Sequence, residues 1–211
     1  MPLGGGTLDL SGRVPVLAVG SNQSPEQLAH KFNGTSWGAV PTIRVELTGF
    51  DSVYSSHISA YGSIPATLYQ APGTTVRLFV NWLNSDQLKH MHETEIGKGN
   101  YAFGMLNGVT IDAEVGPTLS QVHLYTSNHG ALNHDGKPVP LSEIQASGRS
   151  WSAMVQTEAQ HHVRDHLDPE KPLNDFILES IANPQIGCHR TDRLRLKSHA
   201  FTHRDWRILA A

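Results

Sequence analysis

The sequence predicts an α+β protein in which a small β-barrel or curled sheet forms the core and helices flank it. Two-residue alternation typical of strands recurs up to about residue 115, and two further helical segments follow after residue 150. Apolar residues make up 38% of the 211, which is typical of a packed core. We expect a flexible leader at 1–13, a main domain at 14–150, and a helical and basic extension at 151–211 packed on the same domain.

Composition and charge exclude several classes of protein. The formal net charge of −3 gives no electrostatic footprint for nucleic acid, and the basic tail after residue 186 is too weakly charged to change this. The chain has no apolar run of roughly 18 residues that would span a bilayer. The start of the sequence lacks the features of a secretory signal, and a lone cysteine, Cys188, makes no internal disulfide. We therefore expect a cytoplasmic protein with neither membrane nor nucleic-acid partners.

The first predicted unit is a strand, a tight turn and a helix. The valine-rich run 14–19 ends at Gly20-Ser21-Asn22, and a capping box with proline at the first helical position follows at 24–27. Such a turn directs free backbone N–H groups and the positive end of a helix at one place, which suits a carboxylate or phosphate. The same residues equally serve only to turn and cap a chain.

The later elements follow from alternation, caps and breakers. Strands are predicted at 42–50, 53–58, 66–69 and 76–80, with a turn at 71–73, and again at 101–106 and 109–115. Helices are predicted from Asn84 to about Glu95, from about 151 to 166 and from 173 to 182. The stretch 126–148 indicates mainly loop, with a turn at 135–136. We expect the tail to fold back over the core, with Trp206 and Ile208 as anchors.

The helix after Asn84 carries the most informative carboxylate. On a wheel of about 100° per residue, Leu88, Met91 and Glu95 share one face, whereas Glu93 lies on the solvent side. A carboxylate on an apolar face is costly to bury unless it is paired or protonated, and burial moves such a group toward acid/base work at neutral pH. In the alternative, the stripe ends at Met91 and Glu95 lies in a solvated last turn.

In combination, these motifs resemble the gamma-glutamylcyclotransferase-like family. The resemblance covers about residues 14–105 and rests on the order of short motifs: the strand into Gly20-Ser21-Asn22, the segment 62–68 with its Ala-Thr pair, a Pro-Gly pair, a strand, and the helix with Glu95. It implies a substrate-binding loop at Gly20, Ser21 and Asn22, and Glu95 as catalytic acid/base. The sequence departs from the family at Val19, where an aromatic residue is usual, and at Ile96, where glycine is common.

The implied reaction needs no metal or cofactor. The free α-amine of a gamma-glutamyl compound attacks its own side-chain carbonyl, expels an amine and leaves 5-oxoproline. One carboxylate can move the protons in turn, and the N–H groups of residues 20–22 would hold the glutamyl carboxylate or the developing oxyanion. Tyr101 either adds a hydroxyl or simply packs in its strand. The expected partner is a small gamma-glutamyl or amino-acid amide, and a homodimer is possible.

Other interpretations stay open on the sequence alone. Val19 favours a binding protein that keeps the fold and has lost turnover, and water in place of the internal amine would give an amide hydrolase releasing free acid. Ser21 would serve a serine hydrolase if a histidine and an aspartate met it. Among 13 histidines, His162 and His166 are one helical turn apart, with His161, Asp165 and Asp168 close by, which suggests either a metal site or a solvated polar helix face. His90 and His92 are two residues apart on the other helix and do not face one way. His129 and His134, with Asp135, lie in a predicted loop that would cover a site.

Overall fold

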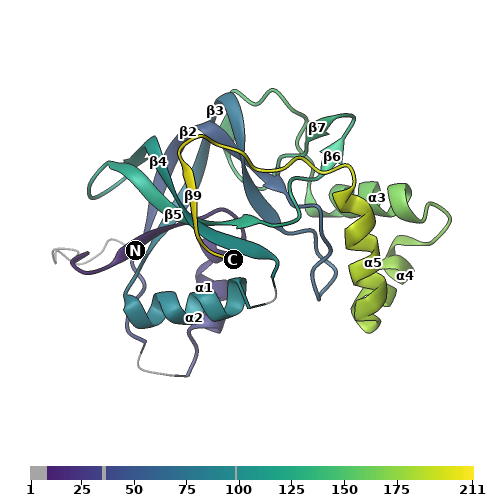
Figure 1. Cartoon of the computed structure of the whole chain (residues 1–211), viewed down its shortest axis with the longest axis horizontal. Coiled ribbons are helices and arrows are strands. Elements are labelled where there is room, and N and C mark those ends of the chain that lie inside the picture. The colour runs from purple at the N-terminus through teal and green to yellow at the C-terminus, as the bar shows by residue number, and fades with distance from the viewer. Residues whose placement is uncertain (1–8, 35–36, 98) are drawn as a thin grey trace.

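A computed structural model describes residues 9–34, 37–97 and 99–211, so the first eight residues of the expected leader lie outside the described residues. Five strands close into a mixed barrel: β1 (Val14–Ala18), β2 (Thr42–Tyr54), β3 (Ala66–Leu83), β4 (Tyr101–Ala113) and β5 (Leu119–Ser127). The order β1-β5-β4-β2-β3 closes because β3 also pairs with β1. Only the β1–β5 pair of the barrel is parallel. The predicted α+β fold with a barrel core is confirmed (Figure 1).

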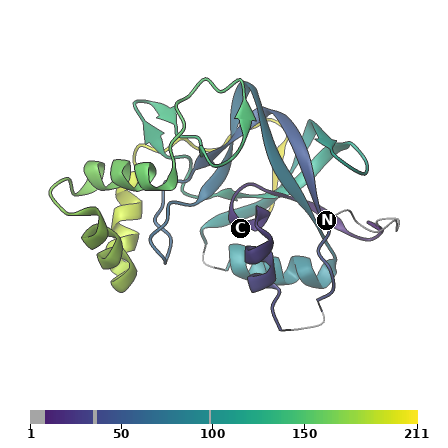
Figure 2. The ribbon, with the colours of Figure 1, turned by 180° about the vertical axis from the view of Figure 1, so that it is seen from behind.

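Helices cover the barrel at two places. The short turn η1 (Ser21–Gln23), α1 (Pro25–Lys31) and α2 (Ser85–Glu95) lie together at one end, and α3 (Gln156–Leu167), α4 (Leu173–Ala182) and α5 (Pro184–Arg195) form a separate group at the side, as both views show (Figures 1 and 2). Short strands complete the fold: β6 (Asn133–His134), β7 (Lys137–Pro138), β8 (Ala146–Ser147) and β9 (Trp206–Ala210). No helix within the described ranges is long and apolar enough to cross a membrane.

The barrel interior is built from alternate residues of its strands. On β2, Ile43, Val45 and Leu47 are at most 5% exposed, while Arg44 and Glu46 between them point outward. Each fully buried aliphatic side chain of this kind contributes about 1.5–3 kcal/mol to folding. This interior holds the strands from which the loops of the candidate site emerge.

The predicted turn at 71–73 is wrong, because β3 runs through it. Pairing with β2 passes from Gln70 opposite Phe50 to Thr75 opposite Thr48, so β3 carries extra residues against Gly49. The proline lies in this bulge, where no ladder hydrogen bond is needed from its missing N–H. The two strands predicted at 42–50 and 53–58 are likewise one strand, β2, which ends at Tyr54.

The C-terminal prediction also needs correction. Asn183 caps α5 by accepting from the N–H of Gln185, so the tail begins with a helix that the sequence analysis missed. The last residues do fold back over the core as expected, and they do so as a strand, β9, paired with β4. Trp206 packs against the barrel core as expected, but Ile208 is 57% exposed and anchors nothing in that core. The segment predicted as loop after residue 126 includes the end of β5 and the β6–β7 hairpin.

Candidate active site

The Gly20-Ser21-Asn22 turn is held against the barrel by its neighbours. A Cβ atom at Gly20 would lie only 2.9 Å from the Cβ of Ala66 on β3, so this close approach requires glycine. The Nδ2 of Asn81, also on β3, donates to the carbonyl of Asn22 at 3.0 Å. The turn is therefore fixed to β3 on both sides of Ser21, which is itself exposed.

Glu95 is the last residue of α2, and its side chain is only 16% exposed. Met91, one turn earlier, is 1% exposed, so the apolar face of the helix continues to the carboxylate. Glu93 is exposed, as the wheel predicts. The alternative of a solvated last turn at Glu95 is therefore wrong. The helix itself is started by a complete capping box between Asn84 and Gln87.

The turn and the helix meet through one hydrogen bond. Asn22 Nδ2 donates to Glu95 Oε1 at 3.0 Å, across 73 residues of sequence. Two motifs that each carry little information alone thus lie in contact. The contact places the Glu95 carboxylate beside a turn whose first residues present backbone N–H groups.

Lys31, which the sequence analysis missed, completes this contact. Its ammonium forms an ion pair with Glu95 Oε1, donates to Asn22 Oδ1 at 2.9 Å, and lies 3.4 Å from the sulfur of Met91. The Lys31 side chain is 7% exposed. A signal was present, because on the helical wheel Lys31 falls about 60° from the buried Leu28 and so on the inward face of α1.

Two tyrosines border Glu95. Tyr101 donates its hydroxyl to the carbonyl of Ala66 at 3.3 Å, and the hydroxyl of Tyr125 shares a 2.8 Å hydrogen bond with His92 Nδ1. Burial, and then the charge of Glu95, raises the pKa of both phenols well above the usual range. Both hydroxyls therefore keep their protons at neutral pH. The predicted role of Tyr101 in binding stays a prediction, and Tyr125 is a neighbour of Glu95 that the sequence analysis missed.

Val19 and Ser21 are the residues on which two alternative functions rest: a binding protein without turnover and a serine hydrolase. Val19 is 6% exposed and packs in the barrel core, while its carbonyl accepts from Ser52 Oγ at 2.7 Å. Within the described ranges, no histidine forms a hydrogen bond with the exposed hydroxyl of Ser21. The arrangement therefore gives Ser21 no base and does not support a serine hydrolase.

The histidines have structural partners. His162 Nε2 bonds to the carbonyl of Asn133 at 2.9 Å, with its ring edge-on to His134. His129 lies 4.7 Å from the ring of His57, which in turn packs edge-on against Tyr101, so it belongs to a cluster behind the site. In the described part of the chain, no three His, Cys, Asp or Glu side chains are arranged to hold a metal ion.

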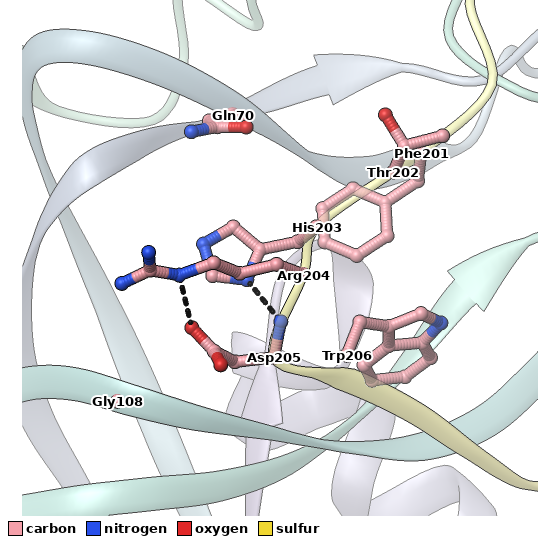
Figure 3. Close-up of a pocket in the computed structure, with 8 residues that line it drawn as sticks. All are labelled: Gln70, Gly108, Phe201, Thr202, His203, Arg204, Asp205 and Trp206. Atoms are coloured by element: carbon pink, nitrogen blue, oxygen red, sulfur yellow. Dashed lines mark hydrogen bonds and ion pairs between the residues drawn. The ribbon is translucent and has the colours of Figure 1, made fainter.

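Two hollows lie away from Glu95, beside the C-terminal segment. One, of about 830 Å³, is lined mainly by residues 201–206 (Figure 3), and another, of about 580 Å³, lies between β5, the end of α5 and β9. In the first, Arg204 reaches over Asp205 and donates to it at 3.0 Å, so the charges pair with each other. Neither hollow is lined by Glu95. At Glu95 itself, Lys31 lies directly against the carboxylate.

No model of a protein family matches the sequence, and no curated protein matches it. Among solved structures, a gamma-glutamyl cyclotransferase aligns with 55% of this chain and 67% of its own, at 21% identity and a TM-score of 0.45. An uncharacterised human protein aligns with 56% of this chain and 68% of its own, at 20% identity and 0.46. A yeast gamma-glutamyl cyclotransferase described as specific to glutathione aligns with 56% and 69%, at 11% and 0.36. The chain is similar in structure to proteins named gamma-glutamyl cyclotransferase, the family that its motifs resemble.

Proposed function

We propose that this chain cleaves a gamma-glutamyl amide, or a related amino-acid amide, by intramolecular cyclisation to 5-oxoproline, with Glu95 as general acid/base. The observation that carries the proposal is the 3.0 Å contact of Asn22 Nδ2 with Glu95 Oε1. It joins the Gly20-Ser21-Asn22 turn to a carboxylate that is largely withdrawn from water. A largely buried carboxylate beside polar groups is well placed to transfer a proton to or from a bound substrate.

The chemistry balances with Glu95 alone as proton carrier. Glu95 takes a proton from the substrate's α-ammonium, and the freed amine attacks the γ-carbonyl carbon to form the new C–N bond. Glu95 gives this first proton to the departing nitrogen, then takes the second proton from the attacking nitrogen and delivers it to the departing amine as the amide C–N bond breaks. The products are 5-oxoproline and a free ammonium compound. Because the attack is intramolecular, holding the substrate in a folded conformation supplies much of the rate.

The neighbouring groups support this assignment. Ser21 and Asn22 begin the helical turn η1, so their backbone N–H groups have no partner inside that turn and can face a developing oxyanion. Tyr101 and Tyr125 keep their protons and so add no charge near Glu95. These roles are part of the proposal and are tested together with it.

The test compares wild type with Glu95→Gln and, as a matched control, Glu93→Gln, which changes an exposed carboxylate on the same helix. Each protein is incubated with a panel of gamma-glutamyl amines and peptides, and the products are identified by mass spectrometry. We expect 5-oxoproline from wild type and Glu93→Gln, and a loss of roughly 10²–10⁴-fold in Glu95→Gln. Free glutamate in place of 5-oxoproline would show hydrolysis at the same site. Unchanged turnover in Glu95→Gln would refute the assignment.

A second candidate function is ligand binding without turnover. The specific observation in its favour is the ion pair between the ammonium of Lys31 and Glu95 Oε1, which a reacting substrate would have to share. The same panel separates the two functions. Folded wild-type protein that binds a gamma-glutamyl compound and forms no product would be a binding protein.

A further inference from the structure

We propose that Lys31 recognises the α-carboxylate of the ligand, so that the site selects compounds whose amino-acid head group carries both charges. The proposal rests on the proposed function for the identity of the site and deepens it. It assigns a specificity role to a residue on α1 that lies outside the motifs of the turn and of α2. The starting point is the Lys31–Glu95 ion pair, a cation and an anion held side by side in a largely dry place.

The surroundings of Lys31 demand a counter-charge. The ammonium has three donors, and its three contacts are Glu95 Oε1, Asn22 Oδ1 and the sulfur of Met91. Of these only Glu95 is charged. Other titratable groups near the pair are His90, whose Nε2 bonds to the Lys31 carbonyl, and two phenols, Tyr101 and Tyr125, whose pKa is raised by burial and then by the charge of Glu95. None of these is an anion at neutral pH, so none replaces the carboxylate.

In the proposed reaction Glu95 accepts a proton, and Lys31 then loses the negative charge with which it is paired. When Glu95 accepts a proton, the 7% exposed ammonium of Lys31 is left without an anion, which is strongly unfavourable in a dry site. A ligand carboxylate beside Lys31 restores the balance. In an α-amino acid the ammonium and the carboxylate are attached to the same carbon, so they match a cation and an anion that touch. The ligand ammonium then meets Glu95 while its carboxylate meets Lys31.

The groups around the ion pair would allow Lys31 to move from Glu95 to the ligand carboxylate. Asn22 donates to Glu95 through Nδ2 and accepts from Lys31 through Oδ1, so one amide orients both charged groups. The backbone of Lys31 is fixed independently, because its carbonyl bonds to His90 Nε2 at 2.9 Å and the His90 ring stacks on Trp37. The lysine side chain can therefore turn toward a ligand without displacing α1.

The experiment measures binding, which does not depend on turnover. L-glutamine, the smallest gamma-glutamyl amide with a free head group, is compared with L-glutamine α-amide, whose carboxylate is a neutral carboxamide. Dissociation constants are taken by calorimetric or NMR titration for wild type, Lys31→Met and Lys31→Arg. Lys89→Met, which removes an exposed lysine of α2, is the matched control.

We expect wild type and Lys89→Met to bind glutamine at least about tenfold more tightly than the α-amide, the scale of one charge-assisted contact. In Lys31→Met the ratio should fall to about one, and in Lys31→Arg most of it should remain. Equal binding of both ligands by wild type, no binding of glutamine by wild type, or an unchanged ratio in Lys31→Met would overturn the proposal. Lys31→Gln, which can still bond to Asn22, gives the same readout if Lys31→Met does not fold.

The outcome is separable from that of the proposed reaction. A Lys31-dependent preference for the free carboxylate without formation of 5-oxoproline would support the role of Lys31 and contradict cyclisation. Formation of 5-oxoproline together with an unchanged preference in Lys31→Met would support cyclisation and contradict the role of Lys31.

Discussion

At the scale of single residues, the burial of His57 makes the stability of the folded protein depend on pH. It is 4% exposed, and its Nδ1 shares a 2.9 Å hydrogen bond with Ser55 Oγ. Burial first, and then the charge that His129 carries when protonated, lowers the pKa of His57 to about 3. The imidazole is therefore neutral in the folded protein over the whole range in which a histidine of the unfolded chain takes up a proton.

We predict that His57 makes the protein less stable as the pH falls. The unfolded chain, with a histidine pKa near 6.5, binds an extra proton between about pH 6.5 and pH 3, so the stabilisation is complete above 6.5 and is lost below it. On the order of 2 kcal/mol should disappear from the free energy of unfolding by about pH 5. Urea unfolding of wild type and His57→Asn at about pH 7 and pH 5 measures the difference.

The control is His189→Asn, at an exposed position on α5, which should keep the wild-type pH dependence. His92, His123, His129 and His199 also have pKa values lowered mainly by burial, so they add a shared slope in the same direction. Only the part that His57→Asn removes belongs to His57. An identical loss of stability in wild type and His57→Asn would show that this group does not titrate as described.

The residues of the candidate site could be predicted from the sequence where they belong to a local motif, such as a helix face or the end of a strand. Glu95 follows from its place on the apolar face of a capped helix, and Gly20-Ser21-Asn22 from the end of a strand before a capped helix. Lys31 lay on the inward face of α1, but a helical wheel does not show which anion a lysine meets 64 residues away. Tyr125 was missed because its strand was not predicted at all.

At the scale of elements, helix-capping residues predicted the boundaries of helices better than proline and glycine predicted the boundaries of strands. The capping residues of α1 and α2 fixed the start of both helices correctly. A proline before glycine predicted a turn in β3, whereas pairing with the long partner strand absorbs both residues in a bulge. Asn183-Pro184 ends one helix and starts the next, and the strand at 206–210 owes its existence to pairing with β4. Such pairing between distant segments is not written in local sequence.

One buried ion pair ties the segment after β8 to the barrel. Arg149 Nε donates to Asp51 Oδ2 at 2.7 Å and Nη2 to Oδ1 at 3.0 Å, and Asp51 lies wholly buried on β2. We predict that Arg149→Met costs about 3–5 kcal/mol of unfolding free energy, because it leaves a buried carboxylate without its partner. Chemical denaturation at neutral pH measures this loss.

Two further variants check the cause. Asp51→Leu combined with Arg149→Met removes both charges and should recover much of the loss, because no buried charge is then unpaired. Arg77→Met breaks a surface pair with Glu46, in which the side chains are 38% and 51% exposed, and should cost less than about 1 kcal/mol. Equal losses in Arg149→Met and Arg77→Met would contradict the importance of burial.

At the scale of the whole molecule, β2 belongs to two cores. Its first half lines the barrel, and its end, Tyr54, is fully buried in a second cluster with residues of α3, α4 and α5. Figure 1 shows the helical group beside the barrel, and β2 reaches this group at its end, where Tyr54 pairs with Ala66, the first residue of β3. A strand shared between both cores leads us to expect that the helical extension and the barrel unfold together.

We predict that Phe176→Ala, in the helical cluster, destabilises both parts. Phe176 on α4 is 2% exposed and lies under the guanidinium of Arg190 at 3.8 Å, so its truncation should cost about 3–5 kcal/mol. Leu178→Ala, 62% exposed on the same helix, should cost little. Hydrogen exchange at increasing denaturant should show α3–α5 and the barrel half of β2 losing protection at one concentration, lower in Phe176→Ala than in wild type. If the helices lost protection first while β2 and the other barrel strands stayed protected, the extension would be a separate folding unit, and the site at Glu95 would depend on the barrel alone.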